Sequence, residues 1–407
     1  MCKRLNALLA ASLILGSLAW GSTERVLYTF MNGSDGGIPI NSGQLTFDHD
    51  GNLYGTTELG GDCGNGTVFK LTPGTHRWTE TVLHSFCGDE GIFPYAGVIF
   101  DGAGNLYGTT TNGGAFTGGT VFQLSPSGSD WTLTTLYNFA VGTDGGGPYG
   151  GVIMDRAGNL YGTAVAGGVN ACRGEGCGIV FKLTKSGSSW NYSVIHSFIS
   201  DDGAYPYAGL VMGGDGNLYG TTQSGGLNGM GVVFQLQKSP GGAWVANVLH
   251  SFGDAGDGQF PGYAKLTVFK GAIYGTVPSG GANGQGLVFS VSRAGGSWKE
   301  TILYNFTGGE AGSVPYSGVK FDQAGNIWGT TEHGGGTECQ APNGCGTIFK
   351  LAPKRGGGWV ENDVVKFVGP NGAIPLGSVI SDGHGHLYGS TSQGGTNDTG
   401  IVFALKP

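Results

Sequence analysis

The sequence predicts an all-β fold, a seven-bladed β-propeller of four-stranded antiparallel blades, from three observations. A phrase close to "GNLYGTT" is written seven times along the chain. A phenylalanine follows each copy in a "VFKL"-like run, at intervals of 53 to 60 residues. The two ends of the chain carry the missing parts of one unit. Repeats of this length that consist of short strands are typical of propeller blades, which close into a ring and leave few exposed edges.

Each unit contains four strand-like runs. In the second unit they cover residues 97–101, 105–110, 119–124 and 131–139. Apolar and polar residues alternate along these runs, which are rich in β-branched and aromatic residues. Clusters of Gly, Pro, Asn and Asp separate the runs. No comparable stretch after the N-terminal segment has a helical period.

The chain ends indicate how the ring closes. Residues 25–30, "RVLYTF", match the fourth strand of a unit, and the final "IVFALKP" matches the third. We therefore expect residues 25–30 to complete the blade that is built from residues 376–405.

Composition and the N-terminus indicate an exported chain. Glycine accounts for 85 of 407 residues and charged residues for 12%, but aromatics reach 11%, which is too high for a disordered chain. Residues 1–21 have two basic residues, an apolar run and small residues, as in a signal peptide. Residues 22–407 are expected to form a single domain, with 18 basic (20 minus 2) against 28 acidic residues, or −10. This balance argues against nucleic acid, and we expect a monomer with no transmembrane segment.

Six cysteines remain after residue 21. The spacings "CRGEGC" and "CQAPNGC" differ from zinc-binding pairs, and we predict the local disulfides Cys172–Cys177 and Cys339–Cys345. Cys63 lies between the second and third strands of its unit and Cys87 follows the fourth, so both should reach one face. We predict that they pair as well.

The motifs resemble a known group of exported proteins. "DGAGNLYGTT" and "DQAGNIWGTT" are similar to strand pairs of NHL-type and two-component-regulator propellers. The order LYGTT, GG, GTVFxL, WxxxxLxxF, DGxxPxxG resembles the GloVer tandem repeats of bacterial choice-of-anchor proteins. The resemblance implies a propeller fold and export, but it implies no activity.

The most regular positions are interpreted as scaffold. The Gly of "LYGT" is expected to allow the close approach of a neighbouring backbone or ring, and "DxxGN" to form the turn between the first and second strands. His84, His196 and His250 share one position with tyrosines and with Val365. We interpret this position as an outward-facing aromatic slot and not as a metal site.

The loop between units carries candidate ligand-binding residues. It reads "DGGIP", "EGIFP" and similar in every unit, and a tyrosine follows the proline in four of them. On one face of a propeller these residues would form an acidic ring around tyrosines near the central opening. The candidates are Tyr95, Tyr149, Tyr207 and Tyr316 with Asp35, Glu90, Asp144, Asp202 and Asp257. They could stack on sugar rings or hold a cation, or they could simply form turns and pack blades together.

A few polar residues depart from the repeat. They are Glu58, Arg173, Glu175, Glu332 and His333, and the best cluster combines Glu332 and His333 with Glu58 at the equivalent position one blade away across the ring closure. The chain has no GxSxG, HExxH or P-loop motif. We therefore favour a non-catalytic binding module for a glycan or a surface protein, secreted or at the cell surface or in the periplasm. A carbohydrate-active enzyme with acids in the central cup is the alternative, and a structural envelope protein is third. No cofactor is expected, although a structural cation such as calcium stays open.

Overall fold

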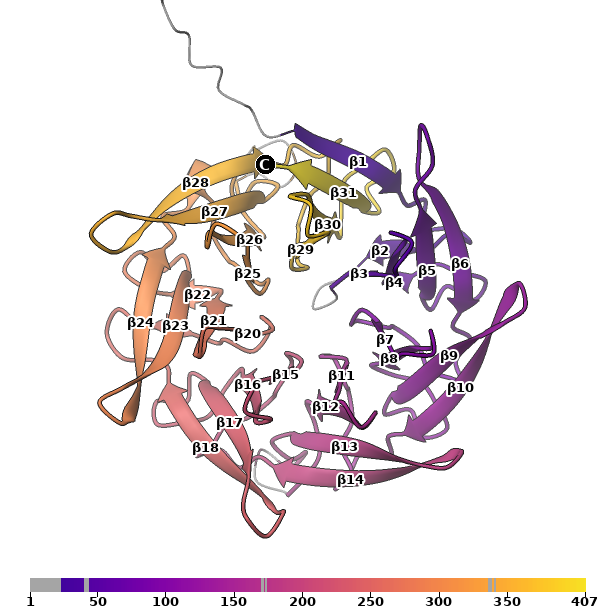
Figure 1. Cartoon of the computed structure of the whole chain (residues 1–407), viewed down its shortest axis with the longest axis horizontal. Coiled ribbons are helices and arrows are strands. Elements are labelled where there is room, and N and C mark those ends of the chain that lie inside the picture. Colours follow the sequence, from indigo (N-terminus) through magenta and orange to yellow (C-terminus); the bar gives the residue numbers. More distant parts are fainter. Residues whose placement is uncertain (1–22, 40–43, 170–171, 173, 336–338, 340–341) are drawn as a thin grey trace, which may run out of the picture.

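The computed structural model describes residues 23–407 except 40–43, 170–171, 173, 336–338 and 340–341. The predicted signal peptide and Arg173 lie outside the described residues. The described chain forms seven four-stranded antiparallel blades in a ring, as predicted (Figure 1).

The strands occupy equivalent places in successive blades. The innermost strands are β3 (Thr46–Phe47), β7 (Ile99–Phe100), β11 (Val152–Met154), β15 (Val211–Met212), β20 (Thr267–Phe269), β25 (Lys320–Phe321) and β29 (Ile380–Ser381). The second strands are β4 (Leu53–Leu59), β8 (Leu106–Thr110), β12 (Leu160–Ala164), β16 (Leu218–Thr222), β21 (Ala272–Val277), β26 (Ile327–Thr331) and β30 (Leu387–Thr391). The third strands are β5 (Thr67–Thr72), β9 (Thr120–Ser127), β13 (Ile179–Ser186), β17 (Val232–Lys238), β23 (Leu287–Ala294), β27 (Thr347–Pro353) and β31 (Ile401–Lys406). The outermost strands are β6 (Thr79–Ser85), β10 (Asp130–Asn138), β14 (Ser189–Ser197), β18 (Trp244–Ser251), β24 (Ser297–Asn305), β28 (Trp359–Lys366) and β1 (Thr23–Thr29).

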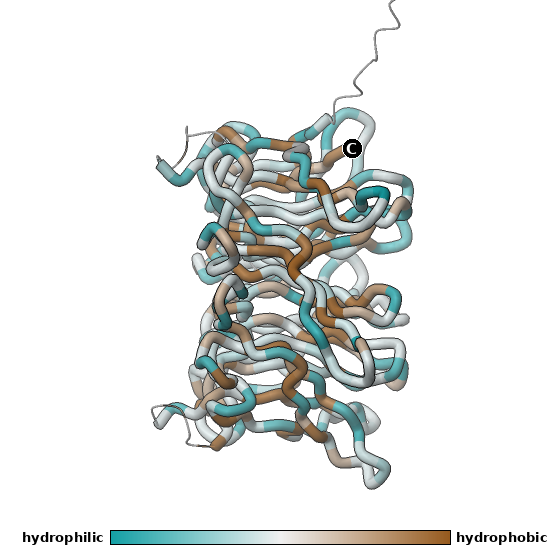
Figure 2. Tube along the Cα trace, turned by 90° about the vertical axis from the view of Figure 1, so that its left-hand side faces the viewer, coloured by the Kyte–Doolittle hydropathy of each residue, from teal (hydrophilic) through white to brown (hydrophobic). Residues whose placement is uncertain are grey.

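The remaining elements lie in loops. They are β2 (Gly37–Pro39), β19 (Gly258–Gln259), β22 (Ser279–Gly280) and the 3-10 helix η1 (Gly309–Ala311). No helix of the described residues is long and apolar enough to cross a membrane. Seen edge-on, the molecule is a disc whose hydrophilic residues gather in loops and whose hydrophobic residues gather in strands (Figure 2).

The first strand of the chain closes the ring. β1 pairs antiparallel with β31, so blade 7 takes its outermost strand from the N-terminal part of the chain (Figure 1). This pairing confirms the closure that the sequence predicted.

The hydrophobic core lies between blades. Seven clusters of buried side chains in the described part of the chain each join two neighbouring blades. Between blades 2 and 3, for example, Tyr107 and Phe139 pack with Leu160 and Phe181. Each blade therefore needs its neighbours in order to bury its apolar faces.

The repeated "LYGT" phrase has the predicted scaffold role. Gly108 on β8 pairs with Phe122 on β9, and a Cβ on Gly108 would lie 2.5 Å from Cζ of that ring. In the turn before β8, the Asp101 carboxylate accepts hydrogen bonds from the backbone N–H of Asn105 (2.9 Å) and the hydroxyl of Tyr107 (3.0 Å). The glycine gives room to the ring, and the aspartate fixes the turn.

Candidate functional site

Seven junction loops, each joining the outermost strand of one blade to the innermost strand of the next, set the geometry of the central opening. The residue before the proline of each loop has a positive φ, which side chains other than glycine rarely adopt. These residues are Ile38, Phe93, Gly147, Tyr205, Phe260, Val314 and Ile374, with φ between 54° and 64°.

Hydrogen bonds to two blades hold this strained residue in place. The Tyr205 N–H donates to the carbonyl of Cys177 in blade 3 (2.8 Å), and the Tyr205 carbonyl accepts the N–H of Gln223 in blade 4 (3.0 Å). The backbone is therefore fixed directly before Pro206 and Tyr207. Strain that neighbouring contacts enforce is common where a loop presents a functional side chain.

Five tyrosines meet at the central opening. They line a cavity of about 350 Å³, which we call the tyrosine cup, together with one acid and one leucine. The lining residues are Tyr95, Tyr149, Tyr207, Tyr263, Tyr316, Glu332 and Leu376. The structure thus brings the four predicted tyrosines together.

Tyr263 is the lining tyrosine that the sequence analysis missed. Gly262 stands between Pro261 and Tyr263, so a search for a tyrosine directly after the proline passes over it. Counting back from the start of the innermost strand places it correctly, because Tyr263 precedes Leu266 by the same three residues that separate Tyr207 from Leu210.

The tyrosines form a continuous arc over blades 2 to 6. Consecutive rings from Tyr95 to Tyr316 have centroids 5.0 to 5.2 Å apart. Three contacts are edge-to-face, whereas Tyr207 and Tyr263 are stacked with 24° between their planes. All five side chains are partly exposed. The arc is therefore a preformed aromatic wall around one cavity.

Two acids lie beside this wall, each in the position that follows "LYGTT". The Tyr95 hydroxyl donates a hydrogen bond of 2.8 Å to Glu58, and burial raises the pKa of Glu58. Burial raises the pKa of Glu332 to about 7, and burial together with the Glu332 charge raises the pKa of Tyr316 to about 12. Near neutral pH the Glu332 carboxyl can therefore either accept or donate a hydrogen bond.

The polar cluster predicted around Glu332 is only partly assembled. Nε2 of His333 lies 3.8 Å from Oε1 of Glu332, and burial lowers the pKa of His333. Blade 7, with Ser392 at the equivalent position, stands between the blades of Glu332 and Glu58. Glu332 lines the cup, whereas Glu58 reaches it through the hydroxyl of Tyr95.

The five predicted loop acids lie in a different place, where blades meet. We call the contacts they make the junction pairs. Each acid approaches the tyrosine or histidine that lies two residues before the phenylalanine directly following the outermost strand. The closest atoms are 3.0 Å apart in Tyr28–Asp35, 2.7 Å in His84–Glu90, 2.7 Å in Tyr137–Asp144, 3.0 Å in His196–Asp202 and 3.0 Å in His250–Asp257. None of these acids lines the tyrosine cup.

The junction pairs also correct our interpretation of the histidine position. His84, His196 and His250 have only 16–18% of their side chains exposed, so the position faces the neighbouring loop and not the solvent. The reason is that the loop acid offers a hydrogen-bonding partner, which favours a polar tip on an otherwise apolar side chain.

One junction gathers three possible metal ligands. The ligand atoms of His250, Asp257 and Glu300 all lie within 4.8 Å of one another. Burial and the Asp257 charge raise the pKa of Glu300 to about 7. Burial lowers the pKa of His250, but its hydrogen bond to Asp257 and the charge of Glu300 outweigh this and raise it. Imidazole and carboxylate groups are a donor set that suits a divalent cation, and without one they can share protons.

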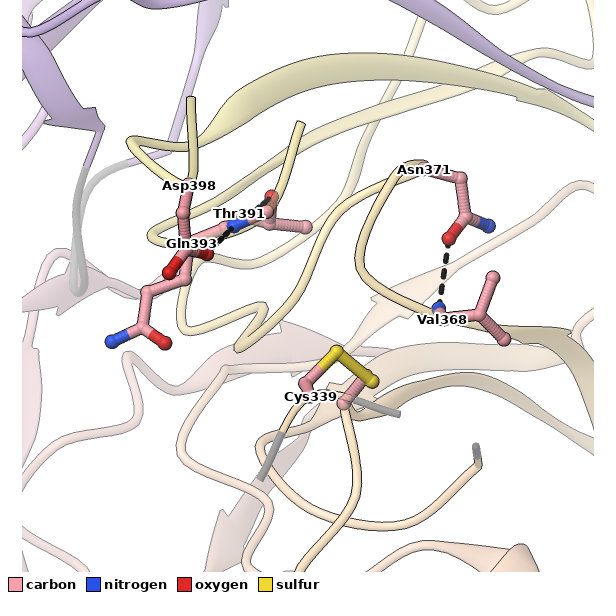
Figure 3. The surroundings of a disulfide bond; sticks show 8 residues. Cys339, Val368, Asn371, Thr391, Gln393 and Asp398 are labelled. Carbon is pink, nitrogen blue, oxygen red and sulfur yellow. Dashed lines mark hydrogen bonds between the residues drawn. A yellow bond between two sulfur atoms is a disulfide. The ribbon is translucent and has the colours of Figure 1, made fainter. Parts of the chain in front are cut away.

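The three predicted disulfides are confirmed. They join Cys63 to Cys87, Cys172 to Cys177 and Cys339 to Cys345, and Glu175 lies in the loop that the second one closes. Figure 3 shows Cys339 beside the junction loop in which Asn371 accepts the N–H of Val368 at 2.8 Å. Cys63–Cys87 joins the loop between β4 and β5 to the junction after β6, whereas the other two disulfides each close a single loop.

A larger hollow of about 850 Å³ lies between blades 4 and 5. It is lined by the Asp215 turn and by side chains that include Lys238, Arg293 and Trp298. Lys238 and Arg293 lie over the rings of Trp244 and Trp298, as part of the packing of the outer hairpins. We interpret the tyrosine cup, where five tyrosines of one repeat position meet Glu332 and Leu376, as the candidate site.

Comparison with known proteins identifies the family. The model of the Gloeobacter/Verrucomicrobia repeat matches residues 17–174 and 173–341. The chain belongs to this repeat family. No curated protein matches it.

Solved structures match in fold. An ancestral GH74 enzyme superposes with a TM-score of 0.54 at 12% identity, over 91% of this chain and 48% of the enzyme, so this chain spans about half of that protein. A protein described as a putative oxidoreductase (glucose dehydrogenase) from Thermus thermophilus gives 0.42 at 17% identity, over 84% and 100% of the chains. A protein of unknown function from Dyadobacter fermentans gives 0.43 at 11%, over 84% and 97%. At these identities the likeness is one of fold alone.

Proposed function

We propose that this chain is an exported, non-catalytic binding module whose tyrosine cup holds a sugar residue of a glycan. The observation that carries the proposal is the arc of five tyrosines around one cavity of about 350 Å³. Small-molecule sites are commonly cavities of about 300–1,000 Å³ with aromatic walls and a few polar groups.

The chemistry of the cup suits a sugar. A sugar ring has an apolar face of C–H groups and a rim of hydroxyls. The rings of Tyr149, Tyr207 and Tyr263 offer flat apolar surface at a low cost in side-chain entropy. Glu332, and Gln223 through the Tyr263 hydroxyl that it contacts at 2.7 Å, offer hydrogen-bonding groups for sugar hydroxyls.

The three disulfides and the N-terminal sequence support export. Disulfides persist in oxidising compartments, and residues 1–21 have the composition of a signal peptide. We propose that the protein acts in the periplasm, at the cell surface or outside the cell.

A glycan array followed by calorimetry tests the proposal. We expect at least one glycan to bind and the Tyr207→Ala variant to bind it at least tenfold more weakly, since stacking surface is lost. Phe116→Ala removes an aromatic side chain that is 59% exposed outside the cup and should leave the affinity unchanged. An array without a single binder, or a binder unaffected by Tyr207→Ala, would refute the proposal.

The raised pKa of Glu332 favours a second candidate, a carbohydrate-active enzyme. A general acid for glycoside cleavage must hold its proton near neutral pH, and burial raises the pKa of Glu332 to about 7. A screen of glycoside hydrolase and lyase substrates separates the candidates. Turnover that is lost in both Glu332→Gln and Glu58→Gln would replace the binding-only role by this one.

A further inference from the structure

A single lysine follows one of the cup tyrosines, in a layer where most other units carry small residues. Two residues after the cup tyrosines of blades 2, 3, 4 and 6 come glycines, and two residues after Tyr263 of blade 5 comes Lys265. These glycines are Gly97, Gly151, Gly209 and Gly318.

The glycines in this layer leave the channel to the lysine. A Cβ on Gly97 would overlap the carbonyl oxygen of Gln44, and a Cβ on Gly318 would overlap that of Lys265. The inner strands are therefore too close for side chains at these positions. Among the described residues at this level, Gln44 is the other large side chain besides Lys265.

Lys265 reaches across the channel. It lines a cavity of about 80 Å³ together with Gln44, Gly97 and Gly151, which belong to blades 1, 2 and 3. Blades 1 and 2 lie across the ring from β20, the innermost strand of blade 5, and blade 3 is separated from blade 5 by blade 4 (Figure 1). The lysine side chain thus occupies the channel between these innermost segments, two residues along the chain from the cup residue Tyr263.

The charge of this lysine is not neutralised within the described protein. No carboxylate there forms an ion pair with it, and burial alone lowers the pKa of Lys265. The channel admits some water, since the side chain keeps part of its surface exposed, but protein surrounds it. An enclosed cation without a counterion costs free energy that a bound anion can offset.

We propose that Lys265 is the floor of the tyrosine cup and that it binds the carboxylate of an acidic sugar, a uronic acid. A uronic acid carries on one ring both an apolar C–H face for the tyrosines and a carboxylate for the lysine. The inference rests on the proposed glycan-binding function and narrows its ligand class.

Matched sugars test the inference. Calorimetry at pH 7 compares short oligomers of galacturonate, glucuronate and mannuronate with the neutral oligomers of galactose, glucose and mannose in the same linkage. We expect at least one uronate oligomer to bind at least tenfold more tightly than its neutral counterpart, which corresponds to about 1.4 kcal/mol.

Variants assign that preference to Lys265. Lys265→Met keeps an unbranched side chain that is one atom shorter and removes an enclosed charge. The variant should therefore fold and melt at the same or a higher temperature than the parent. It should lose the preference for the uronate and keep the affinity for the neutral oligomer. Lys320→Met, on the innermost strand of blade 6 but exposed, should retain the preference.

The outcomes also separate the two proposals. Three results would each overturn the role of Lys265 as a uronate-binding group. Neutral sugars could bind as tightly as uronates, the preference could survive in Lys265→Met, or galactose 6-phosphate could bind more tightly than the uronates. In each of these cases the glycan-binding function would stand. Binding of no glycan of any kind would overturn both proposals.

Discussion

Tyrosines and acids occur in two circles of this propeller, and the five tyrosines of the inner circle share one cavity, the tyrosine cup. In the outer circle, at the blade junctions, the Tyr137 hydroxyl donates to Asp144 at 2.7 Å and its ring stacks on Tyr192 with centroids 3.7 Å apart. In the inner circle, Tyr207 contacts two other cup tyrosines and lines the cavity.

The difference separates side chains whose polar tips approach the acid of a neighbouring loop from side chains whose rings line one cavity. Each outer pair is formed by the same two repeat positions, so the partner is built into the next segment of the chain. The inner positions change from tyrosine to leucine between blades 6 and 7, and the layer below changes from glycine to lysine in blade 5. Each pattern is present in five blades, and the circles differ in what the side chains contact: the acid of the next loop in the outer circle, and neighbouring tyrosine rings and the cup in the inner circle.

The largest expected effect is on the outer circle. In Asp144→Ala the Tyr137 hydroxyl and the backbone N–H of Ala140, which donates to Asp144 at 3.2 Å, lose their acceptor. We expect the free energy of unfolding to fall by about 3 kcal/mol, because hydrogen bonds to charged groups contribute about 1.5–3 kcal/mol each. Denaturant unfolding with the disulfides intact measures it.

The control for this change is Asp201→Ala, which removes an exposed loop acid next to Asp202. It should leave the stability unchanged. Equal losses in both variants would show that the junction pairs contribute nothing specific, and the contrast between the circles would fail.

The blade architecture could be predicted from the sequence because it depends on local patterns. The "LYGT" glycines predicted the close approach of a neighbouring backbone or ring, and at Gly108 the neighbour is the ring of Phe122. Residues 25–30 match the fourth strand of a unit and the last strand matches the third, and this predicted the β1–β31 pairing. The four tyrosines directly after proline were found because turn and strand positions repeat at fixed offsets.

The rest depends on distances across blades, which a repeat alignment does not contain. The loop acids were expected around the opening, but each approaches a side chain about seven residues or fewer away in the chain and stays at the junction. Lys265 occurs in one unit only, so the repeat gave no reason to select it as a site residue. The pKa of Glu332 is raised by burial, which only the folded ring produces.

A smaller effect is expected at the Tyr28–Asp35 junction pair, where Glu80 adds a second acid. Burial, reinforced by the charge of Asp35, raises the pKa of Glu80 from 4.5 to about 7. For a carboxyl with a raised pKa, the stabilising contribution is present below pH 4.5 and is lost as the pH rises through about 7. Glu80→Gln should therefore be more stable than the parent at pH 8, by about 2 kcal/mol, and similar to it at pH 4.

Denaturant unfolding at the two pH values measures the change. The exposed Glu175→Gln is the control and should show no pH-dependent difference. A Glu80→Gln variant that is less stable than the parent at pH 8 would mean that the carboxylate is ionised and paired in the native protein.

The smallest effect is expected in the inner circle. Tyr207→Leu keeps an apolar side chain at the cup wall and removes two ring contacts, at 5.2 Å to Tyr149 and at 5.2 Å to Tyr263. Aromatic pairs contribute about 0.5–1.5 kcal/mol beyond area burial, and the partly exposed ring should lie at the lower end, so we expect a loss of about 1 kcal/mol in total. Tyr137→Leu in the outer circle loses a stacked ring and leaves Asp144 without its hydroxyl donor, and it should cost at least twice as much. Denaturant unfolding of the two variants under the same conditions measures the ratio of the two losses. A greater loss of stability for Tyr207→Leu would mean that the cup tyrosines stabilise the fold, and it would contradict their assignment as a binding wall.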